Sequence, residues 1–332
     1  MIENRRSLSL VSIINYQFSI IDLLSSTFAY QATAMSSANY RFIDPHILAA
    51  ISDLHLLAKT VVDGFMLGAN LSPRPGVGLE FNQYRSYQPG DDLRLVDWKM
   101  YARSDRYYVR EADIETSITV RLILDASASM AHEDNGIVKF DYARFLVAAL
   151  GYLAHVQGEA VGLEIINDTA VTHLPPKRDH QQLHRLLHEL ERVQPHGIWP
   201  DWKKLEGIFT ATQKREMIVL ISDLHEQRGE IFAALSKLSA LRNEVLFFHL
   251  LGRNELDFNY DGFLTFEDLE SGQTLQVDAS RARGVYLNQM QEKLRRLKQA
   301  LHDENIGYTL FTLDQPLDFA LRQYLTQRMK LA

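Results

Sequence analysis

Four oxygen-bearing side chains follow two apolar segments of this sequence, and they are the residues best suited to bind a metal ion. Asp125, Ser127 and Ser129 come directly after the apolar, β-branched residues 119–124. Asp223, preceded by Ser222, comes after the apolar residues 217–221. Mg²⁺ prefers about six oxygen ligands and commonly takes only one or two carboxylates while it keeps several waters. The residue types therefore predict an open site for Mg²⁺ or Mn²⁺.

The two carboxylates have to meet for such a site to exist. The carboxyl ends of neighbouring parallel strands lie at one edge of an open sheet, where ligands commonly bind. Asp125 and Asp223 would then lie close together although they are far apart in the sequence. A simpler interpretation stays open, in which Ser127 and Ser129 only cap the helix entry that follows the first strand.

Strand-like and helix-like segments alternate from residue 119 onward, as the predicted site requires. Strands are expected at residues 119–124, 160–166, 217–222, 244–251 and 307–313, and helices at 139–156, 180–193, 229–241 and 281–305. This alternation is typical of an α/β fold, with a doubly wound, mainly parallel sheet that helices cover on both faces. A hairpin that turns at Ser271-Gly272 is expected near residues 262–278, before the last helix and strand.

The chain before residue 119 has a different pattern. Apolar residues recur at spacings of three and four between residues 44 and 68, which predicts an amphipathic helix. Residues 78–87 and 107–114 are β-like. We therefore expect a poorly ordered leader at 1–43, a helix with a small β-rich subdomain at 44–118, and the α/β domain at 119–332. Met35 is an alternative to Met1 as the start of translation.

The composition excludes several classes of protein. The 332 residues contain no cysteine, which rules out disulfides, thiol catalysis and thiolate metal sites and fits a reducing cytoplasm. The formal net charge of -7, without a lysine or arginine block, argues against nucleic acid as a partner. The apolar residues 8–24 are interrupted by polar side chains and are too short to span a membrane. We expect a cytoplasmic protein without stable membrane insertion.

Signatures of the common enzyme classes are missing. The sequence has no Gly-x-Gly-x-x-Gly after the first strand, no Gly-x-x-x-x-Gly-Lys-Ser/Thr phosphate loop, and no Gly-x-Ser-x-Gly elbow around Ser127 or Ser129. No set of catalytic residues emerges, so the chain is predicted not to be an enzyme. One alternative stays open, a metal-dependent hydrolase in which Asp125 and Asp223 hold a cation that activates water.

Three histidines recur at every fourth residue of one predicted helix. His180, His184 and His188 share a stripe that suits Zn²⁺ or Ni²⁺. The core face of the same helix consists of leucines, namely Leu183, Leu186, Leu187 and Leu190. The histidines are therefore expected beside the core, toward solvent, rather than in a metal site.

Several motifs follow one another between residues 76 and 130. They are Gly76-x-Gly78-x-Glu80-Phe81, Arg85-x-Tyr87-x-Pro89-Gly90-Asp91-Asp92-x-Arg94-x-x-Asp97-Trp98, Ala102-Arg103, and Leu124-Asp125-x-Ser127-x-Ser129-Met130. Together they resemble the bacterial "domain of unknown function 58" family, over roughly residues 45 to 325. That family looks like a degenerate von Willebrand factor A domain with a preceding signature segment, and its genes usually neighbour a MoxR-type AAA+ ATPase.

The resemblance implies a metal-ion-dependent adhesion site. Asp125, Ser127 and Ser129 would form its first loop, and Asp223 would be its later carboxylate. The von Willebrand pattern also expects a threonine near a glycine in a loop between them. The candidate loop, residues 195–201, contains Gly197 but no threonine, and Asp201 is the oxygen ligand that would replace it.

The signature segment invites a second interpretation. Its polar and aromatic members are Arg85, Asp91, Asp92, Arg94, Asp97 and Trp98. Aspartate beside arginine forms bidentate pairs that hold a short loop, and Pro followed by Gly suits a tight turn. Carboxylate, arginine and tryptophan together are also typical of an interface hot spot. The segment is therefore expected to hold its own loop together, and an interaction surface is the alternative.

The sequence as a whole predicts a non-enzymatic interaction module. Its Mg²⁺-type site, or a degenerate remnant of one, would engage acidic groups of a partner. Family context implies work with a MoxR-type AAA+ ATPase on a client protein that the sequence does not identify, in the assembly or activation of a complex.

Overall fold

A computed structural model describes the chain at residues 53–68, 83–86, 101, 103, 107–111, 118–210, 215–225, 229–317, 319, 321, 322, 324 and 325. The predicted leader at 1–43 lies outside these residues. So do five of the six signature residues, namely Asp91, Asp92, Arg94, Asp97 and Trp98.

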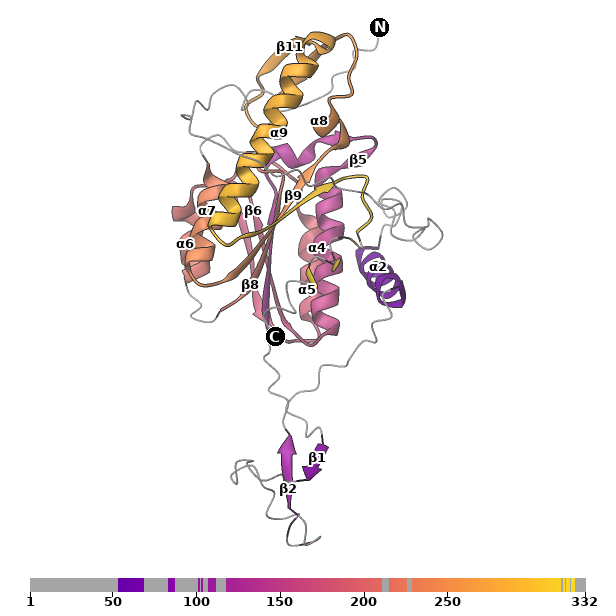
Figure 1. The fold of residues 1–332 in the computed structure, drawn as a ribbon, viewed down its shortest axis with the longest axis vertical. Coiled ribbons are helices and arrows are strands. Elements are labelled where there is room, and N and C mark those ends of the chain that lie inside the picture. Colours follow the sequence, from indigo (N-terminus) through magenta and orange to yellow (C-terminus); the bar gives the residue numbers. More distant parts are fainter. Residues whose placement is uncertain are drawn as a thin grey trace.

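A six-stranded sheet forms the centre of the fold (Figure 1). In spatial order its strands are β12 (Gly307–Thr312), β9 (Glu244–Leu251), β8 (Met217–Ser222), β3 (Thr119–Asp125), β6 (Ala160–Ile166) and β7 (Val171–Lys177). Neighbouring strands are parallel except β6 and β7. The five expected strands and the mainly parallel α/β sheet are confirmed.

The edge strand β7 is missing from the sequence prediction. It runs antiparallel to β6 and contains Pro175 and Pro176, which cannot donate ladder hydrogen bonds and therefore argue against a strand. The ladder with β6 is irregular between Val161 and Leu163. A Cβ atom on Gly162 would lie 2.7 Å from Cγ of Pro176, so a glycine allows the proline strand to approach here.

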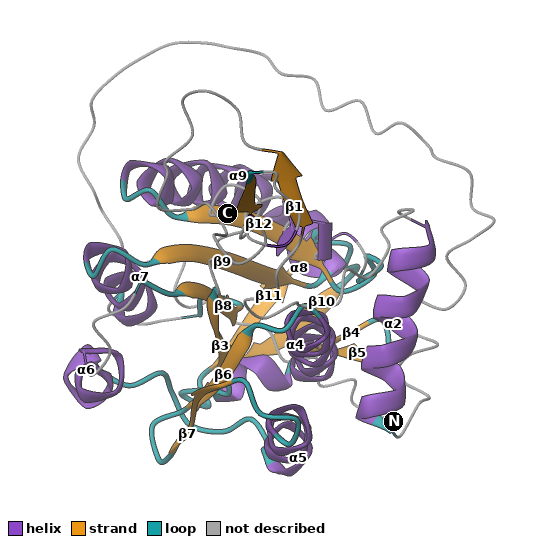
Figure 2. Ribbon diagram, turned by 90° about the horizontal axis from the view of Figure 1, so that it is seen from below, coloured by secondary structure: helices purple, strands orange, loops and turns teal. Residues whose placement is uncertain are grey.

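Helices cover both faces of the sheet (Figure 2). One face carries α2 (Leu54–Gly68), α4 (Lys139–Val156) and α5 (Gln182–Arg192), and the other carries α6 (Trp202–Thr210), α7 (Glu230–Ala240) and the C-terminal part of α9 (Ala279–Asp303). Successive side chains of a strand point to opposite faces. Leu122 and Leu124 of β3 accordingly lie in the first core, and Ile123 lies in the second. Both faces are therefore buried, as in other doubly wound sheets.

Four expected helices are confirmed, with ends shifted by a few residues, whereas α6 is not anticipated by the sequence. Only Leu205 and Phe209 of α6 are buried, and two apolar positions are too few to predict a helix from periodicity. The late helix, α9, begins at Ala279 because the side chain of Asp278 accepts hydrogen bonds from the backbone amides of Ser280 and Arg281.

The helix that precedes the main sheet shares the core of that sheet. Leu57, Val61 and Phe65 of α2 are buried in the same cluster as α4, and Figure 2 shows α2 beside α4. The amphipathic pattern of residues 44–68 is thus confirmed for residues 54–68. The predicted domain boundaries stay predictions, but α2 is packed as part of the α/β core.

The two β-like pieces before the main sheet form a small antiparallel pair. β1 (Gln83–Ser86) pairs with β2 (Tyr108–Glu111), and Arg85 lies opposite Val109. Arg85 is the one signature residue that the structure describes, through its backbone in β1. The role of the signature segment stays a prediction.

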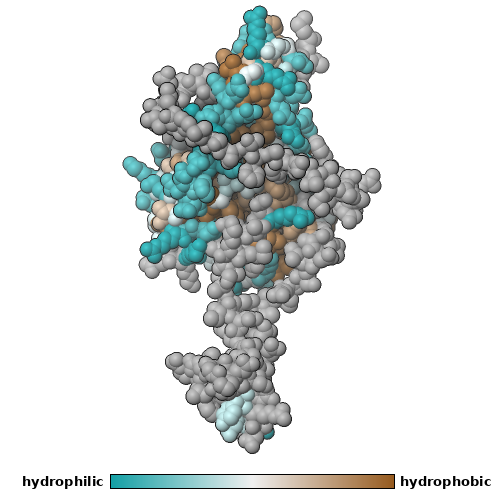
Figure 3. All heavy atoms as spheres, in the orientation of Figure 1, coloured by the Kyte–Doolittle hydropathy of each residue, from teal (hydrophilic) through white to brown (hydrophobic). Residues whose placement is uncertain are grey.

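The expected hairpin before the last helix is confirmed. β10 (Phe263–Glu267) and β11 (Thr274–Asp278) are antiparallel, and residues 268–273 form the turn. The hairpin, the segment after the short helix α8 (Arg253–Asp257) and the N-terminal half of α9 bury a third apolar cluster around Phe258, Phe266 and Tyr286. Figure 3 shows apolar atoms among polar ones at this end of the molecule, where Phe263 is 86% exposed.

Candidate functional site

The predicted site residues meet at the carboxyl edge of the sheet. β3 and β8 are adjacent parallel strands in which Leu124 lies opposite Ile221, so Asp125 and Ser222 leave the sheet at the same level. Ser222 Oγ donates to Asp125 Oδ2 at 2.5 Å, and the backbone N–H of Ser127 donates to Asp125 Oδ1 at 2.9 Å. Both oxygens of Asp125 are thus fixed by the chain itself.

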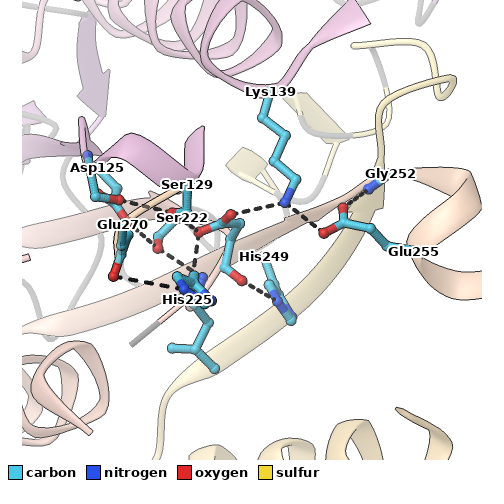
Figure 4. Close-up of polar contacts among 12 residues, drawn as sticks. Asp125, Ser129, Lys139, Ser222, His225, His249, Gly252, Glu255 and Glu270 are labelled. Atoms are coloured by element: carbon cyan, nitrogen blue, oxygen red, sulfur yellow. Dashed lines mark hydrogen bonds and ion pairs between the residues drawn. The ribbon is translucent and has the colours of Figure 1, made fainter. Parts of the chain in front are cut away.

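A buried chain of hydroxyls joins the two strand ends (Figure 4). Ser127 Oγ lies 3.0 Å from Ser129 Oγ, and Ser129 Oγ donates to Asp223 Oδ1 at 3.0 Å. The backbone N–H of His225 donates to the same oxygen at 3.2 Å. Ser127, Ser129, Asp125 and Asp223 are all buried. The prediction that they lie together is correct, and whether they bind a metal stays a prediction.

Ser127 and Ser129 do not cap the helix of their loop by side-chain hydrogen bonds. The loop forms a short 3₁₀ helix, η3 (Ala128–Ala131), and the side chain of Ser127 at its N-cap accepts no hydrogen bond from the backbone. Both hydroxyls point instead into the polar chain between the strand ends. The simpler interpretation of the two serines, as helix caps, is therefore not supported.

A lysine that sequence reasoning missed lies beside the second carboxylate. Lys139 starts α4, and its Nζ donates to Asp223 Oδ2 and to Glu255 Oε1, at 2.9 Å in each case. Burial alone would lower the pKa of Lys139, but the carboxylates of Asp223 and Glu255 hold it above its usual value. Burial alone would likewise raise the pKa of Asp223, and the Lys139 ammonium instead holds it well below its usual range. The pair is a buried salt bridge.

Two further contacts, from Glu255 and from His249 of β9, hold this salt bridge in place. Glu255 Oε2 accepts the backbone N–H of Gly252 at 2.6 Å, which orients its other oxygen toward Lys139. His249 Nε2 lies 3.1 Å from the backbone oxygen of Asp223, and burial lowers the pKa of this imidazole to about 3. The position of Asp223 is therefore fixed from several sides.

Among the residues that the structure describes, no lysine or arginine forms a salt bridge with the first carboxylate, Asp125. Burial raises the pKa of the Asp125 carboxyl to about 7, and the nearby charge of Asp223 adds to this shift. Glu270, in the turn of the β10–β11 hairpin, lies in the same polar group (Figure 4). Burial, together with the charges of Asp223 and Asp125, raises the pKa of Glu270 to about 9. This end of the site therefore holds two acidic side chains whose charged forms are disfavoured by burial.

The loop at residues 195–201 lies directly against the serine loop. The backbone N–H of Ala128 donates to Gly197 O, and that of His196 donates to Ala126 O, at 2.9 Å in each case. Gly197 has a φ of +69°, and a Cβ atom there would lie 1.8 Å from Asp168 Oδ1, so only glycine fits. Asp201 is exposed just before α6, and its role as a replacement ligand stays a prediction.

Comparison with known proteins identifies the family. The model of the family described as protein of unknown function DUF58 matches residues 83–296. The chain belongs to this family. An uncharacterized protein of Mycobacterium tuberculosis and one of Mycobacterium bovis are each 31% identical to it over 233 residues, which cover 69% of this chain and 73% of either relative.

The solved structures that align with this chain do so with low scores, and one of them is a VWA domain. The conserved hypothetical protein BatB from Bacteroides thetaiotaomicron aligns with a TM-score of 0.42 and 13% identity, over 64% of this chain and 100% of that one. The Rpn10 VWA domain aligns with a TM-score of 0.37 and 12% identity, over 63% and 95%.

The donor set of this DUF58 site fits a hard cation. Two oxygens at adjacent corners of an octahedral shell of radius roughly 2.0–2.1 Å lie about 3 Å apart. The distances of 3.0 Å from Ser129 Oγ to Ser127 Oγ and to Asp223 Oδ1 match that spacing. Within the described ranges, no three His, Asp or Glu side chains are positioned to hold a metal ion. A cation here would therefore depend on the serine hydroxyls for part of its shell.

Three charged residues of the site are absent from the sequence prediction. Lys139 could have been noticed in the sequence, because it is the first residue of a predicted helix, where the positive end of the helix dipole makes a lysine unfavourable. Its burial thus indicates a carboxylate partner. Glu255 and Glu270 give no comparable signal, since the tertiary packing of α8 and of the hairpin brings them to the sheet edge.

The histidine stripe of α5 has the place that the sequence predicts. His180, His184 and His188 are exposed. The His184 ring stacks on His55 of α2 with a centroid distance of 5.6 Å, and His180 lies edge-on to His155 of α4 at 6.4 Å. The histidines thus help to connect three helices.

None of the helices in the described part of the chain combines the length and apolar character that crossing a membrane requires.

Proposed function

We propose that this DUF58 chain is a protein-interaction module that binds an acidic side chain of its partner at the carboxyl edge of the sheet. The hydrogen-bonded chain from Asp125 through Ser127 and Ser129 to Asp223 carries this proposal. It keeps the oxygens of two distant strand ends at a spacing that fits adjacent positions of a metal shell.

Each residue has a separate part in this proposal. Ser127 and Ser129 offer hydroxyl oxygens, and Asp125 offers the carboxylate that has no cationic partner. Lys139 neutralises Asp223, whose other oxygen then positions the Ser129 hydroxyl. A bound Mg²⁺ or Mn²⁺ would supply open coordination positions that accept a carboxylate from outside.

The partner that we propose is a MoxR-type AAA+ ATPase, together with a client protein. The support is the resemblance of the sequence motifs to a family whose genes usually neighbour such an ATPase. The net charge of -7 disfavours direct contact with an acidic partner, and a bound cation would offset part of that repulsion.

A pull-down with a MoxR-type ATPase from the same genome tests the proposal. The wild-type chain should retain the ATPase in Mg²⁺ and lose it in EDTA, and Asp125→Asn or Ser129→Ala should lose it in both. Asp261→Asn, which changes an exposed carboxylate, is the matched control and should retain it. Equal retention by wild type in Mg²⁺ and in EDTA would show that the contact needs no cation.

A further inference from the structure

The turn of the β10–β11 hairpin holds one carboxylate toward the site. The side chain of Asp268 organises the turn, because its oxygens accept the backbone N–H of Glu270 at 3.0 Å and the hydroxyl of Ser271 at 2.7 Å. The backbone N–H of Gly272 closes the turn on Asp268 O at 2.8 Å. Glu270 is therefore presented by a fixed turn and not by a loose loop.

The Glu270 carboxylate is buried without a matching donor. Its side chain is 2% exposed, and its Oε1 has no hydrogen-bond partner in the described part of the chain. Its Oε2 lies 3.7 Å from His225 Nε2, which is beyond hydrogen-bond distance. A buried carboxylate is costly unless a charge or donors compensate it. Figure 4 shows Glu270 beside Asp125, and the unpartnered, buried oxygen of Glu270 leaves room for a cation to bind there.

We propose that Glu270 is an internal ligand that completes the cation site, so that an acidic partner has to displace it in order to bind. This inference rests on the proposed cation-dependent interaction and adds its regulation. Asp125, the two serines and Glu270 together form an all-oxygen set, which suits Mg²⁺ or Mn²⁺. The hairpin turn then occupies the position at which the carboxylate of a partner would enter.

The packing of the hairpin allows such a displacement. Its apolar residues are buried in the third cluster, around Phe258 and Phe266, and not in either core of the sheet. The turn contacts the end of β8 through His225, whose Nε2 lies 3.4 Å from Asp268 Oδ1. Withdrawal of the turn would break this polar contact and leave both main cores intact. The hairpin is thus a separate unit that can open the site.

Mn²⁺ binding to the full chain tests the role of Glu270. Removal of the carboxylate in Glu270→Ala should weaken Mn²⁺ binding by at least about tenfold, the lower end of the loss when a group that supports a metal is removed. Proton relaxation of water should show about one additional water on the bound Mn²⁺, because water fills the vacated position. Millimolar acetate should restore the affinity of Glu270→Ala and should not change that of wild type.

Two controls separate this inference from the proposed function. Glu267→Gln removes a carboxylate from the same hairpin but outside the turn, and it should bind Mn²⁺ as wild type does. Asp125→Asn should bind none. If wild type and Glu270→Ala bind Mn²⁺ equally well, Glu270 is not a ligand, and the proposed cation site is unaffected. Weak binding by Glu270→Ala that acetate does not restore also contradicts the inference. If wild type does not bind Mn²⁺, both the cation-dependent interaction and the role of Glu270 as a ligand are wrong.

Discussion

Two buried charge clusters lie on the same face of β3, around residues that are four positions apart in the strand. In the middle of the sheet, Arg121 donates through Nε and NH2 to both oxygens of Glu216, at 2.7 and 3.0 Å, and through NH1 to Glu164 at 2.6 Å. At the carboxyl end of the same strand, Asp125 belongs to the cluster that contains Glu270, with its unmatched oxygen. The first cluster is closed and the second is open.

The difference separates a structural network from the binding site that we propose. Each oxygen of Glu164 and Glu216 has a partner, since His173 Nδ1 lies 2.8 Å from both oxygens of Glu164. Phe209 of α6 covers the guanidinium of Arg121, with 5.6 Å from Cζ to the ring centroid. Such a network leaves no position for a ligand. Burial alone therefore does not indicate function; unmatched buried charge does.

The largest expected effect comes from opening the closed cluster. Arg121→Met removes the guanidinium that pairs with two buried carboxylates and should lower the free energy of unfolding by about 3–5 kcal/mol. Urea denaturation measures this loss, and Mn²⁺ should not reverse it. The triple variant Arg121→Met, Glu164→Gln, Glu216→Gln should recover most of the stability. A triple variant as unstable as the single one would show that packing against Phe209, not charge, dominates.

Removal of the lysine from the open cluster should have a smaller and cation-dependent effect. Lys139→Met leaves Asp223 and Glu255 unpaired, so the unfolding free energy in EDTA should fall by about 3 kcal/mol. Mn²⁺ should recover more of this loss than it adds to wild type, because a second carboxylate becomes available to the cation. Thermal unfolding with and without Mn²⁺ measures both quantities. If Mn²⁺ raised the melting temperature of both proteins equally, the cation would not interact with Asp223.

Neutralisation of Asp125 should remove only the stability that a bound cation adds. At a Mn²⁺ concentration of 100 times the dissociation constant, wild type should gain about 2.7 kcal/mol of stability, and Asp125→Asn should gain none. In EDTA the two proteins should agree within about 1 kcal/mol, since the amide keeps one acceptor oxygen. Calorimetric melting in both conditions provides the test, and a Mn²⁺ shift in Asp125→Asn would assign the cation to another site.

The smallest effect is expected at the exposed histidine stripe. His188→Gln should change the unfolding free energy by less than about 0.5 kcal/mol, because the side chain is exposed and borders no site. Zn²⁺ or Ni²⁺ should not raise the melting temperature of wild type relative to this variant. A metal-dependent difference would show that the stripe is a second metal site.

The sequence predicts local features of this molecule well and tertiary contacts poorly. Asp125 and Asp223 are identified because an apolar run marks each strand, and the topology of a parallel sheet then brings their ends together. Glu270 is not identified, although its hairpin is, because no local pattern states where a hairpin packs. β7 is overlooked because Pro175 and Pro176 contradict the usual composition of a strand.

The two prolines of β7 also affect how copies of this chain can associate. An exposed edge strand invites pairing with a strand of another chain, and this pairing leads to domain swapping or aggregation. Pro175 and Pro176 have no N–H to donate, so β7 is a poor template for an added strand. The opposite edge, β12, contains no proline. Of the two edges of the central sheet, β7 is therefore the poorer template for a strand of another chain.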